Sequence, residues 1–328
     1  KDVTLVEDLE DKMGLLELTY SMAYNAKCNF SDTFGMVKYW ETIIYNFLKE
    51  QGIQTPPQKL DRSKTHSIVG AYVKDPIVGK HDWVMSFDLN SLYPHIIMQH
   101  NISPEKMVKG GERMDVNVQK MLDQTVDLSS LKDSNRTVTP NGVMFSREKQ
   151  GFLPELMETF YEERKEWKGK MIEYQKELQK CTDRKRKNEL NTLIKRAYNN
   201  QQVRKIALNS AYGALANQYF AFFDPNLAEG ITTAGQMIIK TAENTINTFL
   251  NDTLGTDEDY VIAMDTDSIY VSFDKMVQKL FPEGTPKSKI VDFLNSAGQD
   301  KILNVLTKGY DDLAEYTNAY QQKMVMGR

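Results

Sequence analysis

The stretch Tyr-Val-Ile-Ala-Met-Asp-Thr-Asp-Ser-Ile-Tyr-Val-Ser-Phe, residues 260–273, decides the fold class. Its two apolar runs, 260–263 and 269–273, are short and rich in β-branched and aromatic residues, as strands are. Asp265-Thr266-Asp267 lies between them. The stretch therefore predicts a β-hairpin with two carboxylates at its tip.

A third carboxylate belongs to a similar context 177 residues earlier in the chain. Residues 83–87 predict a buried strand that ends at Asp88, and a helix is expected from about Leu89 to Gln99. A single Asp at a turn or a helix start is common and often structural. Together, Asp88, Asp265 and Asp267 offer the hard oxygen ligands that Mg²⁺ prefers, which predicts a magnesium site for phosphoryl chemistry.

Between these carboxylates lies a long helical region. From Pro154 to about Leu215 the pattern predicts two long helices, broken near residues 181–188, which form an antiparallel hairpin. Residues 160–205 hold fourteen Lys or Arg against seven Asp or Glu, although the whole chain carries −4. Charge is therefore segregated, and this basic hairpin is a candidate for phosphate contacts. Two solvated helices with salt-bridged faces are the alternative.

The remaining segments complete an α+β prediction. Helices are expected over 6–26 and 35–51, with Gly52 as a stop, followed by a linker over 54–64. Pro140-Asn141-Gly142 predicts a hairpin turn, and another helix is expected over 232–251. The chain has 328 residues, enough for two or three substructures.

Composition excludes several classes of protein. No run of eighteen apolar residues occurs and residues 1–3 do not begin a signal peptide, so no membrane segment is expected. Only Cys28 and Cys181 occur, far apart, which favours neither a disulfide framework nor a zinc site. A reducing cytoplasm fits this usage.

Three motifs follow one another in the chain. They are Asp-Leu-Asn-Ser-Leu-Tyr-Pro at 88–94, Lys-Ile-Ala-Leu-Asn-Ser-Ala-Tyr-Gly at 205–213 and Asp-Thr-Asp-Ser at 265–268. In that order they resemble D-x-x-S-L-Y-P, K-x-x-x-N-S-x-Y-G and D-T-D-S of the family B DNA polymerases. The likeness extends between the motifs, through 101–105, 142–147, 164–168 and 231–236, and is strongest to replicative polymerases of the T-even bacteriophage type.

The resemblance implies a role for each matching residue. Asp88 and Asp267 are expected to bridge two Mg²⁺ ions with Asp265 beside them, and the backbone of Leu89 is also expected among the metal ligands. The other implied contacts are to the nucleotide and the base pair. The backbone N–H groups of Leu89, Ser91 and Leu92 contact the triphosphate, with Ser91 also capping its helix; Tyr93 lies under the sugar; Arg164, Lys168, Lys205 and Asn209 hold the phosphates; Tyr212 packs on the nascent base pair; and Gly213 admits the template.

The same resemblance implies a domain plan. Residues 1–66 would be a helical remnant of an exonuclease domain with a linker, 67–152 and 216–328 two parts of an antiparallel palm sheet backed by helices, and 153–215 the inserted helical fingers. A thumb is expected to be absent. Asp2 is expected to be the last carboxylate of an exonuclease site whose partners are missing, so no proofreading is expected. We expect a polymerase fragment or a subunit of a split polymerase, with a weak grip on DNA.

One position departs from the family pattern. Met264 stands where family members usually carry Gly, directly before Asp-Thr-Asp-Ser. Either the turn manages without the freedom of Gly or the position needs no positive φ. The placement of Asp265 depends on which of these holds.

The function that follows is template-directed DNA synthesis by transfer of a deoxynucleotide to a primer 3′-hydroxyl, with release of pyrophosphate. Expected partners are primer–template DNA, dNTPs and the remaining polymerase segments, in the cytoplasm of an infected bacterial host. A catalytically silent DNA-binding or assembly subunit of a split polymerase is the main alternative. A metal-dependent nuclease is less favoured, because hydrolysis has no use for a triphosphate clamp.

Overall fold

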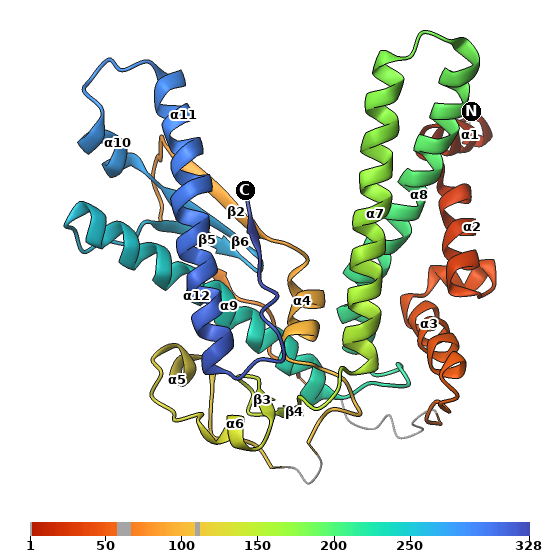
Figure 1. Ribbon diagram of the computed structural model, residues 1–328, viewed down its shortest axis with the longest axis horizontal. Helices are drawn as coiled ribbons and strands as arrows, with labels where there is room; N and C mark the ends of the chain where they lie inside the picture. The colour runs from red at the N-terminus through yellow and green to blue at the C-terminus, as the bar shows by residue number, and fades with distance from the viewer. Residues whose placement is uncertain (1, 58–66, 109–111) are drawn as a thin grey trace. The chain divides into compact units, whose positions relative to one another are not determined.

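The computed structural model describes residues 2–57, 67–108 and 112–328 (Figure 1). Two compact units can be distinguished in it. The helical unit contains the described residues up to 57 together with 155–224, and the sheet unit contains those of 67–154 together with 225–328. Residues 58–64 of the predicted linker lie outside the described residues.

The sheet unit is built on a five-stranded antiparallel sheet. Its strands are ordered β1-β5-β6-β2-β7, and every neighbouring pair is antiparallel. The bounds are β1 Val73–Lys74, β2 Val84–Leu89, β5 Val261–Asp265, β6 Ser268–Ser272 and β7 Met326–Gly327. The predicted class, a mixture of helices with an antiparallel sheet, is confirmed, as is the predicted hairpin of β5 and β6.

Helices bury one face of this sheet and leave the other exposed. In β2 burial alternates, with Met85, Phe87 and Leu89 in the core and the residues between them exposed. The long helix α9 (Pro225–Leu254) packs against β5, β6 and α12 (Leu303–Tyr316). Burying each of these large apolar side chains contributes roughly 1.5–3 kcal/mol. Functional side chains are thereby confined to the exposed face.

Smaller elements complete the sheet unit (Figure 1). A two-stranded hairpin is formed by β3 (Arg136–Val138) and β4 (Met144–Ser146), and Gly142 in its turn has φ 83°. This confirms the hairpin predicted at 140–142. The other helices are α4 Leu92–Gln99, α5 Val118–Leu122, α6 Ser130–Asp133, α10 Asp274–Leu280 and α11 Lys287–Ala297, with a short π-helical segment, η2, at Gly298–Ile302.

The helical unit centres on two long helices. α7 (Phe152–Lys180) and α8 (Arg184–Leu215) are joined by three residues, which confirms the predicted pair of long helices and its break. Ion pairs join Glu177 to Arg186 near the connection and Glu163 to Arg204 far from it. This order of contacts belongs to antiparallel helices, as Figure 1 shows in green.

Three helices from the start of the chain join this unit. They are α1 (Asp2–Met13), α2 (Leu15–Ala26) and α3 (Met36–Glu50), with a 3₁₀ turn, η1, at Phe30–Phe34. α2 and α3 pack against α8, and the buried Trp40 donates to Ser210 Oγ at 3.1 Å. The prediction of one helix over 6–26 was wrong, because Gly14 has the left-handed φ of 62° and separates α1 from α2.

Candidate active site

The register of the sheet aligns two of the three predicted carboxylates. Asp88 on β2 lies opposite Ser268 on β6, and Ser268 lies opposite Asp265 on β5. Residues directly opposite each other in a ladder project their side chains from the same face of a sheet. Asp88, Ser268 and Asp265 therefore form one row, which we call the aspartate row. Both of its carboxylates are on exposed residues.

The third carboxylate belongs to the turn beside this row. Thr266 takes the left-handed φ of 55°, and the N–H of Asp267 donates to the carbonyl of Asp265 at 2.6 Å. The carbonyl of Asp267 in turn accepts from the N–H of Leu89 at 2.8 Å, which ties the turn to the end of β2. The backbone thus fixes Asp267 next to Asp88, in a half-buried position.

Electrostatics couple the three acids. Burial, and then the charges of Asp88 and Asp265, raise the pKa of Asp267 above its ordinary value. Burial also raises the pKa of Asp88. Like charges this close disfavour ionisation, so a cation at this place would relieve the repulsion.

The acids are near one another but do not form a closed cage. Within the described ranges, no three His, Cys, Asp or Glu side chains are grouped closely enough to hold a metal ion by themselves. Two strand spacings put the Cα atoms of Asp88 and Asp265 about 10 Å apart. Mg²⁺ usually keeps several waters and binds one or two carboxylates together with substrate phosphates. An open arrangement of acids fits that mode of binding.

The segment between β2 and α4 differs from its prediction. β2 continues through Leu89, and the helix begins only at Leu92. Ser91 is at the N-cap position of α4, as predicted, but it has φ 48° and its side chain makes no capping hydrogen bond. The N–H of Leu89 is engaged by Asp267, whereas that of Leu92 is at the first helical position, where no intrahelical acceptor exists.

Tyr93 is half-buried against α9. A side chain at Gly235 would begin 3.4 Å from the ring of Tyr93 and 3.6 Å from Leu92. The absence of a side chain at Gly235 therefore lets α9 lie close to the start of α4. This contact holds the Tyr93 ring at the start of α4, against α9.

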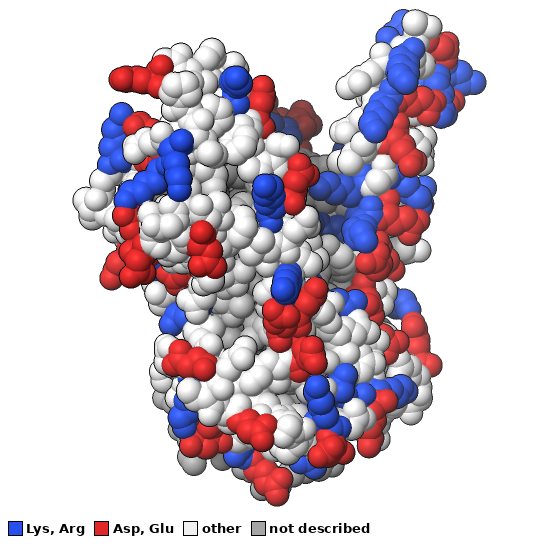
Figure 2. All heavy atoms as spheres, turned by 60° about the vertical axis from the view of Figure 1, so that its left-hand side comes forward, with Lys and Arg blue, Asp and Glu red and all other residues white. Residues whose placement is uncertain are grey.

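The four side chains predicted to hold the phosphates, Arg164, Lys168, Lys205 and Asn209, all belong to the helical unit. Lys205, Asn209 and Gly213 are exposed and four residues apart, so they form one stripe along α8. Arg164 and Lys168 are likewise four apart on α7. Figure 2 shows basic side chains along this hairpin, interspersed with acidic ones.

Ion pairing distinguishes these cations from five of the other basic side chains on α7 and α8. Lys165 pairs with Glu162 and Lys170 with Glu166. By contrast, in the part of the chain that the structure describes, no carboxylate lies within 4 Å of Arg164, Lys168 or Lys205. Nε of Arg164 is buried without a hydrogen-bond partner. The ion pairs of the two helices are Lys165–Glu162, Lys170–Glu166, Arg186–Glu177, Arg186–Glu189, Lys195–Glu17 and Arg204–Glu163. The three cations are therefore available to an anion from outside the chain.

Tyr212 and Gly213 lie within α8 and not at its end. A Gly after an apolar residue often ends a helix, but α8 continues to Leu215, so Gly213 is not a helix cap. A side chain at Gly213 would meet no atom within 4 Å. Tyr212 is half-buried, and burial raises its pKa. The sequence therefore leaves an open backbone at Gly213 beside an aromatic ring.

Comparison with known proteins identifies the family. The family model for DNA polymerase family B matches residues 35–282, a range that holds all three motifs. The chain belongs to DNA polymerase family B. It is 31% identical to the DNA-directed DNA polymerase of Escherichia phage RB69 and 32% identical to that of Enterobacteria phage T4, with all of this chain and 40% of each relative aligned. It is 26% identical to the DNA polymerase delta catalytic subunit of Drosophila melanogaster, over 72% of this chain and 20% of the relative.

These matches confirm the predicted phage type of family B. The chain spans about 40% of the length of the two phage relatives. Separately, the described helices include none that is both long and apolar enough to cross a membrane.

Met264, the departure from the family pattern, leaves the turn intact. It lies in β5 opposite Ile269, is 1% exposed, and has no positive φ. The left-handed residue of the turn is Thr266. Since Met264 points into the core, Asp265 beside it points to the exposed face. The position of Met264 therefore needs no positive φ, which was the second possibility raised by the sequence.

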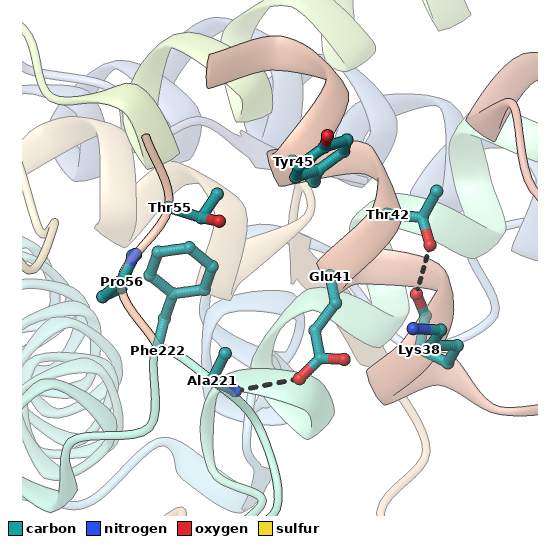
Figure 3. Close-up of a pocket in the computed structure, with 8 residues that line it drawn as sticks. All are labelled: Lys38, Glu41, Thr42, Tyr45, Thr55, Pro56, Ala221 and Phe222. Atoms are coloured by element: carbon teal, nitrogen blue, oxygen red, sulfur yellow. Dashed lines mark hydrogen bonds between the residues drawn. The ribbon is translucent and has the colours of Figure 1, made fainter. Parts of the chain in front are cut away.

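A cavity of about 470 Å³ lies elsewhere, in the helical unit (Figure 3). Residues of α3 and of the segment around Ala221 line it, and Glu41 accepts a hydrogen bond from the N–H of Ala221 at 3.0 Å. None of the predicted site residues contributes to its wall. Ser268, which lies between Asp88 and Asp265 in the aspartate row, belongs to the Asp-Thr-Asp-Ser motif but was given no role from the sequence.

Proposed function

We propose that the chain carries out nucleotidyl transfer in template-directed DNA synthesis. A primer 3′-hydroxyl would attack the innermost phosphate of a dNTP, and pyrophosphate would leave. The observation that carries this proposal is the aspartate row, with Asp267 fixed beside it by the bond between its carbonyl and Leu89. Membership of family B supports the same chemistry.

Two Mg²⁺ ions are part of this proposal. When bound, such ions lower the pKa of the attacking hydroxyl and stabilise the entering and leaving oxygens. Asp88 and Asp267 would hold them, with the backbone of Leu89 as a further ligand and Asp265 beside them. The raised pKa values of Asp88 and Asp267 support this role, because a cation would replace repulsion by attraction.

The helical hairpin would bind the triphosphate. Arg164, Lys168 and Lys205 lack carboxylate partners among the described residues, so binding a phosphate would break no ion pair of theirs. Arg supplies planar paired contacts to phosphate and Lys a compact charge. Asn209 extends the stripe, while Tyr212 and Gly213 would contact the nascent base pair. In this assignment the hairpin is the fingers and the sheet unit is the palm.

The start of α4 would complete the nucleotide site. The N–H groups of Ser91 and Leu92 precede or begin a helix, where unpaired donors and the helix dipole favour anions. Leu89 would contribute through the metals, since its N–H is already engaged by Asp267. Tyr93 would lie under the sugar and exclude a 2′-hydroxyl by steric contact.

Primer–template DNA and dNTPs are the proposed partners. Further polymerase segments are also proposed partners, because the chain aligns with 40% of its phage relatives. The proposed setting is the cytoplasm of an infected bacterial host.

Single-nucleotide primer extension tests the function. The chain would be held in excess over labelled primer–template at low salt, which favours weak DNA binding. Wild type and Asp252→Asn, which changes an exposed carboxylate on α9, should both extend the primer when Mg²⁺ is present. Asp88→Asn should not. Equal extension by Asp88→Asn would show that the aspartate row does not hold the reaction centre.

A further inference from the structure

We infer that Lys74 is a positioning residue for the turn that joins β5 to β6. Its ammonium is held by Glu243 and Asp259, and the turn carries Asp265 and Asp267. All five residues belong to the sheet unit. The inference rests on the proposed function, because its consequence is the placement of proposed metal ligands.

The edge strand β1 and the residue before it support this turn through their backbone. In the ladder, Val73 of β1 pairs with Asp265 of β5. The carbonyl of Tyr72 accepts from the N–H of Thr266 at 3.0 Å. Thr266 is the left-handed residue of the turn, a conformation that residues other than glycine adopt at a cost. The position of β1 therefore bears directly on the backbone of the turn.

A polar stripe on α9 holds the segment that contains β1. This strand is two residues long and lies at the edge of the sheet, so strand pairing alone gives it few hydrogen bonds. The residues of the stripe are three or four apart and share one helix face. Their contacts are Thr232 Oγ1 with the carbonyl of Val69, Gln236 Nε2 with the carbonyl of Gly70, the Lys240 ammonium over the ring of Tyr72, and the Glu243 carboxylate with the Lys74 ammonium. The segment is therefore held along its length by successive turns of α9.

Lys74 makes the charged contacts of this segment. It lies opposite the buried Met264 in the ladder, so it projects from the face of the sheet that the helices cover. Its side chain is 14% exposed, and its Nζ donates to Glu243 Oε1 at 2.5 Å and also to Asp259. Burial lowers the pKa of Lys74, but these two hydrogen bonds raise it by more, so the ammonium stays charged. Charge-assisted hydrogen bonds are stronger than neutral ones, so Lys74 contributes most to the hold on β1.

Asp259 ties the same ammonium to the start of β5. Its Oδ1 accepts from Asn247 Nδ2 at 2.9 Å and from the N–H of Val261 at 3.1 Å, while its Oδ2 accepts from Lys74. One cation therefore joins α9, β1 and the beginning of β5. Without it, the carboxylates of Glu243 and Asp259 would face each other and repel, and β1 would lose its charged contacts.

The effect of Lys74 on the acids has a distinctive sign. Its positive charge is one residue from the ladder partner of Asp265, so removing it would by itself favour a cation at the acids. Displacing the turn would spread the proposed ligands and weaken the binding of a cation. Weaker Mg²⁺ binding in a Lys74 variant would therefore report displacement of the turn and not the change of charge.

Three substitutions and two measurements test the inference. Lys74→Ala removes the ammonium, and Lys74→Arg keeps a cation. Lys275→Ala is the matched control, since it removes the cation of an exposed ion pair with Glu258, the neighbour of Asp259 in the chain. Hydrogen–deuterium exchange of residues 261–268 in the metal-free chain reports the turn. Single-nucleotide incorporation over a Mg²⁺ series gives the half-saturating Mg²⁺ concentration and the maximal rate.

We expect Lys74→Ala to speed exchange over residues 261–268. It should also raise the half-saturating Mg²⁺ concentration roughly tenfold, as loss of a group that supports metal ligands does, with the maximal rate recovering at high Mg²⁺. Lys74→Arg should restore most of both values, and Lys275→Ala should match wild type. An unchanged or lower half-saturating concentration in Lys74→Ala would overturn the inference. So would a lower maximal rate alone, which means only that less of the chain is folded.

Glu243→Gln provides a second route if Lys74→Ala does not fold, because it keeps the pair of Lys74 with Asp259. It should speed exchange and raise the half-saturating Mg²⁺ concentration about threefold, as loss of one hydrogen-bond partner would. Its control is Glu258→Gln, which removes an exposed carboxylate of the other pair. Equal behaviour of these two variants would also overturn the inference.

The proposed function and this inference can fail separately. If wild type incorporates no nucleotide at any Mg²⁺ concentration, the proposed function fails on its own. Exchange in the metal-free chain then decides the inference. Faster exchange at 261–268 in Lys74→Ala but not in Lys275→Ala supports it, and unchanged exchange in Lys74→Ala contradicts it.

Discussion

The two hairpins of this chain hold charge in opposite ways. The β5–β6 hairpin brings like charges together, since Asp265 and Asp267 share their turn with Asp88 on the neighbouring strand. The α7–α8 hairpin spreads its charges along exposed helices, where five of the fourteen Lys and Arg side chains have carboxylate partners and Lys205 has none among the described residues. The acids are placed by sheet register and the cations by helical period. The acids at the β5–β6 hairpin repel one another, and a bound cation would offset that repulsion. The cations along α7 and α8 are separated, and each can interact with an anion.

The largest effect is expected at the crowded acids. Asp267→Asn should lower nucleotide incorporation by about 10²–10³-fold, because it removes a proposed metal ligand at the reacting phosphate. Incorporation over a Mg²⁺ series measures it, with Asp252→Asn as the matched control. Activity within about threefold of wild type would remove Asp267 from the reaction.

The cations should respond more weakly and in a different parameter. Lys205→Ala should raise KM for the dNTP about 10- to 100-fold, since it removes one unpaired charge from the proposed phosphate site. Lys170→Ala removes a cation of the same hairpin that is already paired with Glu166, and should leave KM near the wild-type value. Steady-state incorporation on both variants measures this difference. Similar KM values for the two variants would mean that pairing does not distinguish the binding cations.

Sugar selection should shift by about tenfold. Tyr93→Ala should raise incorporation of ribonucleotides relative to deoxynucleotides, because the ring packed against Gly235 would no longer meet a 2′-hydroxyl. Tyr93→Phe keeps the ring and is the control. Competition between a dNTP and its ribonucleotide measures the ratio. An unchanged ratio in Tyr93→Ala would place selection elsewhere.

A separate effect concerns stability and a group outside both hairpins. Burial lowers the pKa of His100 to about 4, and its Nδ1 lies 3.1 Å from the hydroxyl of Thr137. The Thr137 hydroxyl donates to the carbonyl of Thr317, so the His100 Nδ1–H is the donor and its buried Nε2 lacks a partner. Protonation would add a buried unpaired donor, which disfavours the charged form.

Because the folded pKa is depressed, the unfolded chain takes up this proton first. The contribution of His100 to the free energy of unfolding should be complete above about pH 6.5 and should fall by about 3 kcal/mol as the pH drops to about 4. Denaturant unfolding across this range measures it, with His100→Gln as the non-titrating reference. Parallel pH profiles for wild type and His100→Gln would contradict the assignment.

Local patterns predicted the parts of the site, while their assembly depended on distant contacts. The β5–β6 hairpin and the two long helices follow from alternation and helical period, and the structure has both. The register that sets Asp88 opposite Ser268 joins segments far apart in the chain, and no local pattern specifies it.

The errors have the same origin. The prediction started the helix before Leu92 because residues 89–91 carry a helix-start signal, but pairing of Leu89 with Met326 extends the strand instead. A single helix over 6–26 satisfied the apolar spacing, and the left-handed φ of Gly14 ended it. The packing of α2 and α3 on α8 joins segments that the sequence assigned separately, and only the structure brings them together.

The central claim is that the three aspartates form one site whose repulsion a metal ion relieves. Thermal unfolding with and without Mg²⁺, at neutral pH, tests it most directly. The raised pKa of Asp267 means that its ionised form costs stability above that pKa, so Asp267→Asn should melt higher than wild type without metal. Mg²⁺ should raise the melting temperature of wild type and of Asp252→Asn, but hardly that of Asp267→Asn. Equal stabilisation of all three by Mg²⁺ would contradict a shared metal site.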